Sequence, residues 1–253
     1  MKISSLACAA LAAMAITQPS SAAVFFTATN GSNLTASATF DIVGGQLQVV
    51  LNNSSAFDVL VPTDVLTALF FNLSSGAGQL GVGGGSATSN GSTFLNGVQQ
   101  NPAGTNVGGE WAYAGVTSVI LGAGTNAGIS SSGYGLFGQA NLNGLNLAGP
   151  TAVDGLQYGI TSTGDNLATG NGGVQNNEIT KHSVTFLLDI AAGFTLAQIG
   201  NVSFQYGTDL ADPRIICTVD CGGPPANEIP EPGSAALAGL ALLAAASARR
   251  RKQ

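Results

Sequence analysis

The chain has 253 residues, of which 8% are charged and 45% are hydrophobic, and its formal net charge is −6. An ordinary soluble domain has about 25% charged residues, so uncharged polar side chains must cover most of this surface. The acidic balance argues against a nucleic-acid-binding protein, which needs a basic surface for phosphates. The scarcity of Glu, Lys and Arg excludes a coiled coil.

Basic residues cluster at the two ends of the chain. All thirteen acids lie between Asp41 and Glu231, and this middle part contains only two bases, Lys181 and Arg214, for a net charge of −11. Lys2 lies at one end, and the other end holds Arg249, Arg250, Arg251 and Lys252. Basic residues beside apolar runs indicate membrane topology, because Lys and Arg stay on the cytoplasmic side.

The first 23 residues have the features of a secretory signal peptide. Lys2 is followed by an apolar region from Ile3 to Ile16 and by the small residues Ser21, Ala22 and Ala23. An apolar region of this length is too short to span a membrane and precedes a typical cleavage site. We therefore predict removal of residues 1–23, and with them Cys8.

The next segments predict β-strands. Apolar and polar residues alternate over 35–42 and again over 46–51, on either side of Gly44-Gly45, which is typical of a β-hairpin. Residues 65–73 are compatible with a strand or a short helix, and the Phe70-Phe71 pair favours the strand. Residues 76–109 are rich in Gly, Ser, Asn and Thr and predict long loops or a mobile insertion.

The second half of the chain continues the pattern. Residues 111–121 predict one long strand or a pair, residues 164–178 predict loops, and further strands are expected at 184–190, 202–206 and 214–219. Many short strands separated by Gly, Asn and Ser turns predict an all-β body, a β-sandwich of jelly-roll-like type, over residues 24–221.

Two cysteines, Cys217 and Cys221, remain after signal removal. An exported protein meets an oxidising environment, so an even pair favours a disulfide. A zinc or redox pair is the alternative, although zinc needs more ligands than these two residues supply. Carboxylates nearby offer a weak candidate for calcium, or a solvated acidic loop: Asp209, Asp212 and Asp220.

The C-terminal segment has three parts. Residues 222–229 form a predicted linker, and Pro230-Glu231-Pro232 then precedes an apolar run over 233–248 and the basic cluster at 249–252. As a helix the run would span about 24 Å, less than the roughly 30 Å hydrocarbon core of a bilayer. We predict a marginal transmembrane helix within residues 230–253, suited to recognition and cleavage by a membrane enzyme.

These three parts together resemble the PEP-CTERM sorting signal. The resemblance implies processing by exosortase, a membrane enzyme of Gram-negative bacteria, with Pro230, Glu231 and Pro232 as the sorting motif. It implies export, transient anchoring in the inner membrane, and delivery to the cell surface or extracellular matrix of bacteria that make exopolysaccharide. It names no activity for the body.

Two classes of function remain. The first is a non-enzymatic surface or matrix protein with a structural or adhesive role in a biofilm, without a cofactor, because no catalytic constellation is evident. The chain has a single histidine, His182, which excludes a multi-histidine metal site. The second is a carbohydrate-binding or carbohydrate-active protein. It would use paired acids such as Asp154, Asp165, Glu178 or Asp209, or an aromatic platform at Trp111 and Tyr113 with Glu110, although Trp111 also fits a core position.

Overall fold

The computed structural model describes residues 22–31, 33–75, 80–115, 124–134, 145–147, 153 and 155–223. The predicted sorting segment, and all but the last two residues of the predicted signal peptide, lie outside these ranges. The described body is mostly β-strand, as predicted, with one single-turn helix, α1 (Gly172–Gln175), and short 3₁₀ turns at Pro62–Asp64, Gly108–Glu110 and Leu196–Gln198. None of the helices in this part of the chain has the length and apolar character that crossing a membrane requires.

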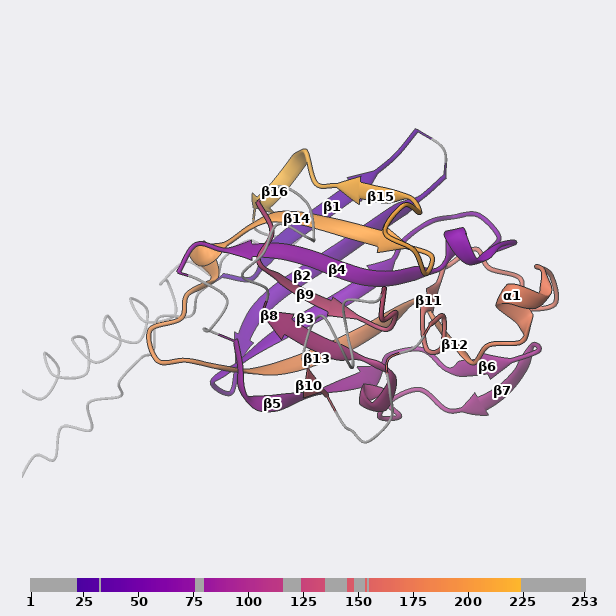
Figure 1. The fold of residues 1–253 in the computed structure, drawn as a ribbon, viewed down its shortest axis with the longest axis horizontal. Helices are drawn as coiled ribbons and strands as arrows, with labels where there is room; N and C mark the ends of the chain where they lie inside the picture. Colours follow the sequence, from indigo (N-terminus) through magenta and orange to yellow (C-terminus); the bar gives the residue numbers. More distant parts are fainter. Residues whose placement is uncertain are drawn as a thin grey trace, which may run out of the picture.

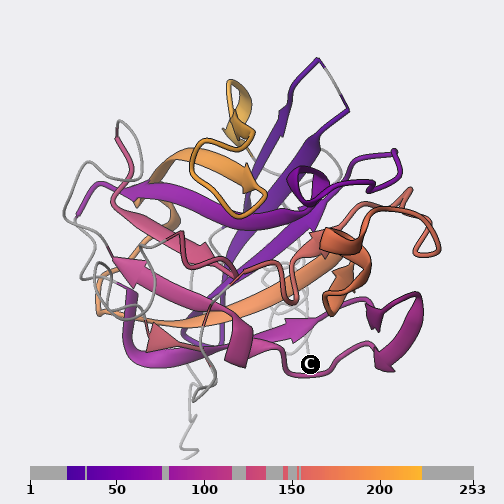
Figure 2. The ribbon, with the colours of Figure 1, turned by 45° about the vertical axis from the view of Figure 1, so that its right-hand side comes forward.

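The strands form two sheets, which Figure 1 and Figure 2 show as two layers with crossing strand directions. In the first sheet the neighbours are β16 (Val219–Gly223), β1 (Val24–Thr29), β2 (Thr35–Val43), β3 (Gln46–Asn53), β13 (Ser183–Ile190) and β5 (Leu80–Ser89). All of these pairs are antiparallel. Within this sheet β1, β2 and β3 follow one another as an antiparallel meander.

The second sheet is centred on β4 (Leu66–Leu73), which pairs with β9 (Ala127–Ser130) and β14 (Ile199–Tyr206). Outward from these lie β8 (Ala112–Gly115), β10 (Leu145–Asn146) and β15 (Arg214–Ile216). A side branch begins where β11 pairs with Leu66 and contains β11 (Ile160–Thr161), β12 (Ile179–Lys181), β6 (Thr93–Leu95) and β7 (Val98–Asn101).

The predicted hairpin is confirmed. β2 pairs with β3 from Ala36–Asn53 to Val43–Gln46, and the turn residues Gly44 and Gly45 have φ angles of +61° and +83°. Two successive positive φ angles produce the tight turn that matches the twist of paired strands, and glycine adopts them without steric cost.

One core joins the two sheets. The ring of Phe40 in β2 contacts Phe26 of β1 at 5.4 Å and Phe71 of β4 at 5.5 Å between centroids, both edge to face. Trp111 is fully buried and meets Phe186 of β13 at 4.9 Å. On the opposite face of β4, Ala68 and Phe70 belong to a second buried cluster. Burial on both faces explains why residues 65–73 are apolar almost without interruption.

The predicted loops at 76–109 are wrong in part, because β5, β6 and β7 lie there. Gly85 of β5 shows the physical reason. A Cβ atom added at Gly85 would lie 2.6 Å from the carbonyl oxygen of Leu187 in the neighbouring strand β13. Glycine therefore permits this close approach, although a glycine-rich segment is usually typical of a loop.

Other predicted bounds also change. The strand expected at 111–121 is β8 as far as Gly115, and residues 116–121 lie outside the described ranges. The predicted loops at 164–178 contain α1. β16 extends to Gly223, two residues into the predicted linker.

We predict that Phe40→Ala lowers the free energy of unfolding by about 3–5 kcal/mol, because it removes the ring that bridges the two sheets. Val43→Ala at the exposed end of the same strand is the matched control and should change it by about 0.5 kcal/mol or less. Urea unfolding of both variants measures the difference, and equal effects would contradict this account of the core.

Candidate functional site

A cavity in the described part of the chain lies at one end of the sandwich, where four connections meet. These are the turn between β1 and β2, residues 55–64 after β3, Ser162 after β11, and Pro213 before β15. The cavity has a volume of about 280 Å³. It is small for a ligand site, since such pockets usually measure about 300–1,000 Å³.

Most of the side chains that line this end pocket are polar. Amides, hydroxyls and carboxylates come from Asn30, Asn33, Ser55, Thr63, Asp58 and Asp64. Phe57 and Leu60 add apolar surface, and they are 54% and 50% exposed. The pocket therefore combines hydrogen-bonding groups with an exposed apolar rim.

Hydrogen bonds fix the segment that carries this rim. Asp64 Oδ2 accepts the backbone N–H groups of Leu60 at 3.1 Å and Val61 at 3.2 Å. The hydroxyl of Ser162 donates to the carbonyl oxygen of Phe57. Sequence reasoning missed this rim. The available signal was an apolar run, Val59 to Val61, between two strands and without strand alternation.

A pair of acids ties the pocket to the next loop. Asp58 accepts the N–H of Asn166 at 2.8 Å and the hydroxyl of Thr169 at 2.6 Å. The Thr169 bond is the main reason that the pKa of Asp58 is lowered. Burial raises the pKa of Asp165 to about 6, and the neighbouring Asp58 adds to the rise. The N–H of Val59, which donates to Asp165 at 3.3 Å, opposes it.

Other acids of the sequence prediction have separate local partners. Glu178 accepts the hydroxyl of Tyr158 and the amide of Asn101, each at 2.9 Å. Burial and the contact with Glu178 raise the pKa of Tyr158 to about 12. Asp154 lies outside the described residues. In the described part of the chain no hydrogen bond joins Glu178 to Asp165. Asp165 instead interacts with Asp58, an acid that the sequence analysis did not single out.

The aromatic platform considered for Trp111, Tyr113 and Glu110 is wrong. All three residues are buried, and Trp111 has no exposed surface. Trp111 therefore occupies the core position that the sequence also allowed.

The candidate calcium ligands are used locally. Asp212 accepts the N–H groups of Thr208 at 3.0 Å and Asp209 at 2.9 Å, and Asp209 accepts that of Ala211 at 2.8 Å. Asp220 lies in β16. No group of three or more His, Cys, Asp or Glu residues suited to a metal ion occurs in the described part of the chain. Calcium binding stays a prediction.

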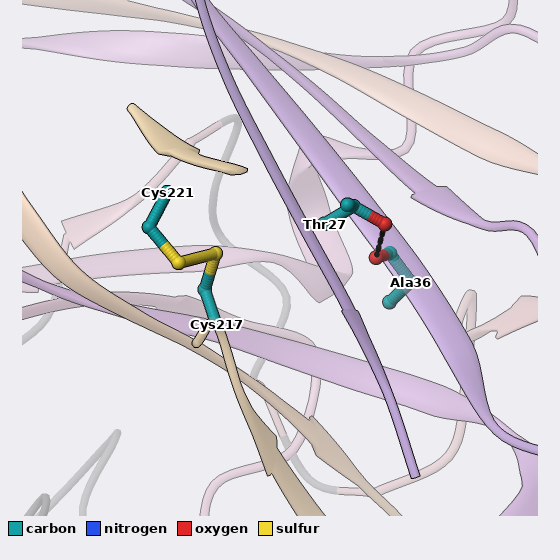
Figure 3. The surroundings of a disulfide bond; sticks show 4 residues. All are labelled: Thr27, Ala36, Cys217 and Cys221. Carbon is teal, nitrogen blue, oxygen red and sulfur yellow. Dashed lines mark hydrogen bonds between the residues drawn. A yellow bond between two sulfur atoms is a disulfide. The ribbon is translucent and has the colours of Figure 1, made fainter. Parts of the chain in front are cut away.

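The predicted disulfide is present between Cys217 and Cys221, whose Cα atoms are 5.8 Å apart (Figure 3). Cys217 follows β15 of the second sheet, and Cys221 lies in β16 of the first. The bond therefore closes the crossing of the chain between sheets, directly before the C-terminal segment.

That segment contains a known sequence motif. Residues 228–252 match the PEP-CTERM protein-sorting motif. The chain carries a PEP-CTERM sorting signal. This motif begins five residues after β16 ends at Gly223 and includes Pro230, Glu231, Pro232 and the basic cluster at 249–252.

The PEP-CTERM motif supports an exosortase-dependent sorting signal and implies an exported, membrane-transiting precursor of a Gram-negative bacterium. It covers only the tail of the chain, residues 228–252. No curated protein and no solved structure matches the chain.

The Asp165 pKa sets a pH dependence of stability. The folded state keeps a proton at Asp165 up to about pH 6, whereas the unfolded chain releases it near pH 4, so stability falls as pH rises through this window. We expect Asp165→Asn to remove this fall and, after allowance for solvent screening, to raise stability at pH 7.5 by on the order of 2 kcal/mol, with little change at pH 4. Thermal unfolding at both pH values tests this, and an unchanged pH dependence would assign it to another group.

Removing the disulfide should lower the free energy of unfolding of the body. The chain-entropy argument for so short a loop predicts that Cys217→Ser with Cys221→Ser costs about 2 kcal/mol. Unfolding of the double variant in urea, compared with the oxidised wild-type chain, measures the loss. A wild-type chain that is equally stable with and without reductant would contradict the prediction.

Proposed function

We propose that the β-sandwich is the mature, non-enzymatic part of an exosortase-sorted protein that acts at the cell surface or in the extracellular matrix. Its role there is structural or adhesive, in contact with exopolysaccharide in a biofilm. The signal peptide at residues 1–23 directs export, and the segment from Pro230 onward holds the precursor in the inner membrane until exosortase processes it.

One observation carries this proposal. The last described strand, β16, ends at Gly223, and the PEP-CTERM motif begins at residue 228. Processing at residues 230–232 would therefore leave every described strand intact. The disulfide between Cys217 and Cys221 ties the chain end to the body just before this point.

The arrangement of the acids favours a binding or structural role over glycoside hydrolysis. A glycosidase needs two carboxyl groups on either side of one bond. Here Asp58 accepts two hydrogen bonds from the loop that contains Asn166 and Thr169, and Glu178 is bound by Tyr158 and Asn101. Through these hydrogen bonds, both acids hold neighbouring segments of the chain together.

Fractionation of the native host, with intact mass of the protein, tests the route. We expect a mature form that begins near Val24, lacks residues 233–253 and is recovered from the surface or matrix. Pro230→Ala with Pro232→Ala should leave the full tail in place and hold most of the protein in the inner membrane.

The linker offers a matched control for this double variant. Pro224→Ala with Pro225→Ala also removes two prolines, but they lie before the sorting motif, so this chain should be processed normally. A wild-type chain that keeps Arg249 to Lys252 and stays in the inner membrane would overturn the proposal.

A further inference from the structure

We propose that the end pocket binds a single neutral sugar residue of a polysaccharide, with Phe57 as its apolar platform. This assignment rests on the proposed function, because it names the place at which the body meets a saccharide. Four features support it: the polar lining of the pocket, the exposure of Phe57, the ordered rim and the charge of the surrounding chain.

The lining suits a ligand that has many hydroxyl groups. Asn33 and Thr63 bring an amide and a hydroxyl to the lining, and these groups accept or donate hydrogen bonds in the directions that sugar hydroxyls need. A volume of about 280 Å³ matches a compact ligand. The pocket opens at the end of the sandwich, so the rest of a polysaccharide chain can continue into solvent.

Phe57 supplies the apolar component. A sugar ring has an apolar face of C–H groups as well as hydroxyls, and an aromatic side chain offers a flat surface for that face. Phe57 is the one aromatic residue with more than half of its surface exposed in the described part of the chain. Leu60, on the same rim, is also half exposed. Exposed apolar residues gathered at a pocket are typical of a binding site.

The pocket is organised before a ligand arrives. Asp64 holds the backbone of Leu60 and Val61, and Ser162 holds that of Phe57. Asp58 is fixed by hydrogen bonds from the neighbouring loop. A rim that is already ordered loses little conformational entropy on binding, which favours affinity.

Charge selects the class of sugar. Asp58 and Asp64 both line the pocket, and the middle of the chain carries a net charge of −11. A uronic acid would place its carboxylate beside these two acids, which costs binding energy by repulsion. Neutral hexoses should therefore bind better than uronic acids.

The full chain, purified in a detergent without a sugar headgroup, is titrated with the methyl glycosides of glucose, galactose and mannose. Saturation-transfer NMR detects binding and calorimetry measures it. We expect saturable binding of at least one neutral glycoside with a dissociation constant on the order of 1 mM. Methyl glucuronide should bind about tenfold more weakly than methyl glucoside.

Two variants locate the site. Phe57→Ala should weaken binding of the neutral glycoside about tenfold, and Thr63→Val should weaken it in the same direction by removing one hydroxyl. Val98→Ala, which truncates an exposed apolar residue in β7, is the matched control and should bind as the wild type does. Unfolding free energies within about 0.5 kcal/mol of wild type show that the variants fold.

No saturable binding of any neutral glycoside, or unchanged binding in Phe57→Ala, would overturn the assignment. This result is separable from failure of the proposed function. A protein that reaches the matrix but binds none of the glycosides contradicts the pocket alone, whereas one that binds them but remains in the inner membrane contradicts the route alone.

Discussion

The contact of Phe40 with Phe26 and Phe71 is the interaction on which the rest of the body depends. It places a ring from β2 against rings from β1 and β4, and so joins the two sheets across one core. Because charged residues are so few, this apolar packing and the strand hydrogen bonds must supply most of the stability. The loops at the end of the sandwich are positioned by strands that this core fixes.

The end pocket follows from that arrangement. Its walls come from segments far apart in sequence, from Asn30 to Pro213, which the two sheets bring together. Asp58 and Asp165 are a further example, since they lie in separate loops far apart in the sequence and become coupled only in the folded chain. Burial then gives Asp165 a pKa that an exposed carboxyl would not have.

Local patterning predicted the parts of the fold that local rules control. The hairpin around Gly44-Gly45 is evident from alternation and from a turn that requires positive φ angles. β5 was not evident, because Gly85 serves a close contact with Leu187 that no local rule describes. Trp111 was ambiguous for a related reason: an aromatic residue can serve the core or a binding surface, and only packing decides which.

The sequence by itself determined the sorting signal of this protein, since the PEP-CTERM motif is identified from one continuous stretch of residues. It also indicated the all-β class and the Cys217–Cys221 pairing, which depend on alternation and on close spacing along the chain. Tertiary structure alone decided the end pocket and the exposure of Phe57. Both depend on which segments the two sheets bring together, and that follows from packing across the core.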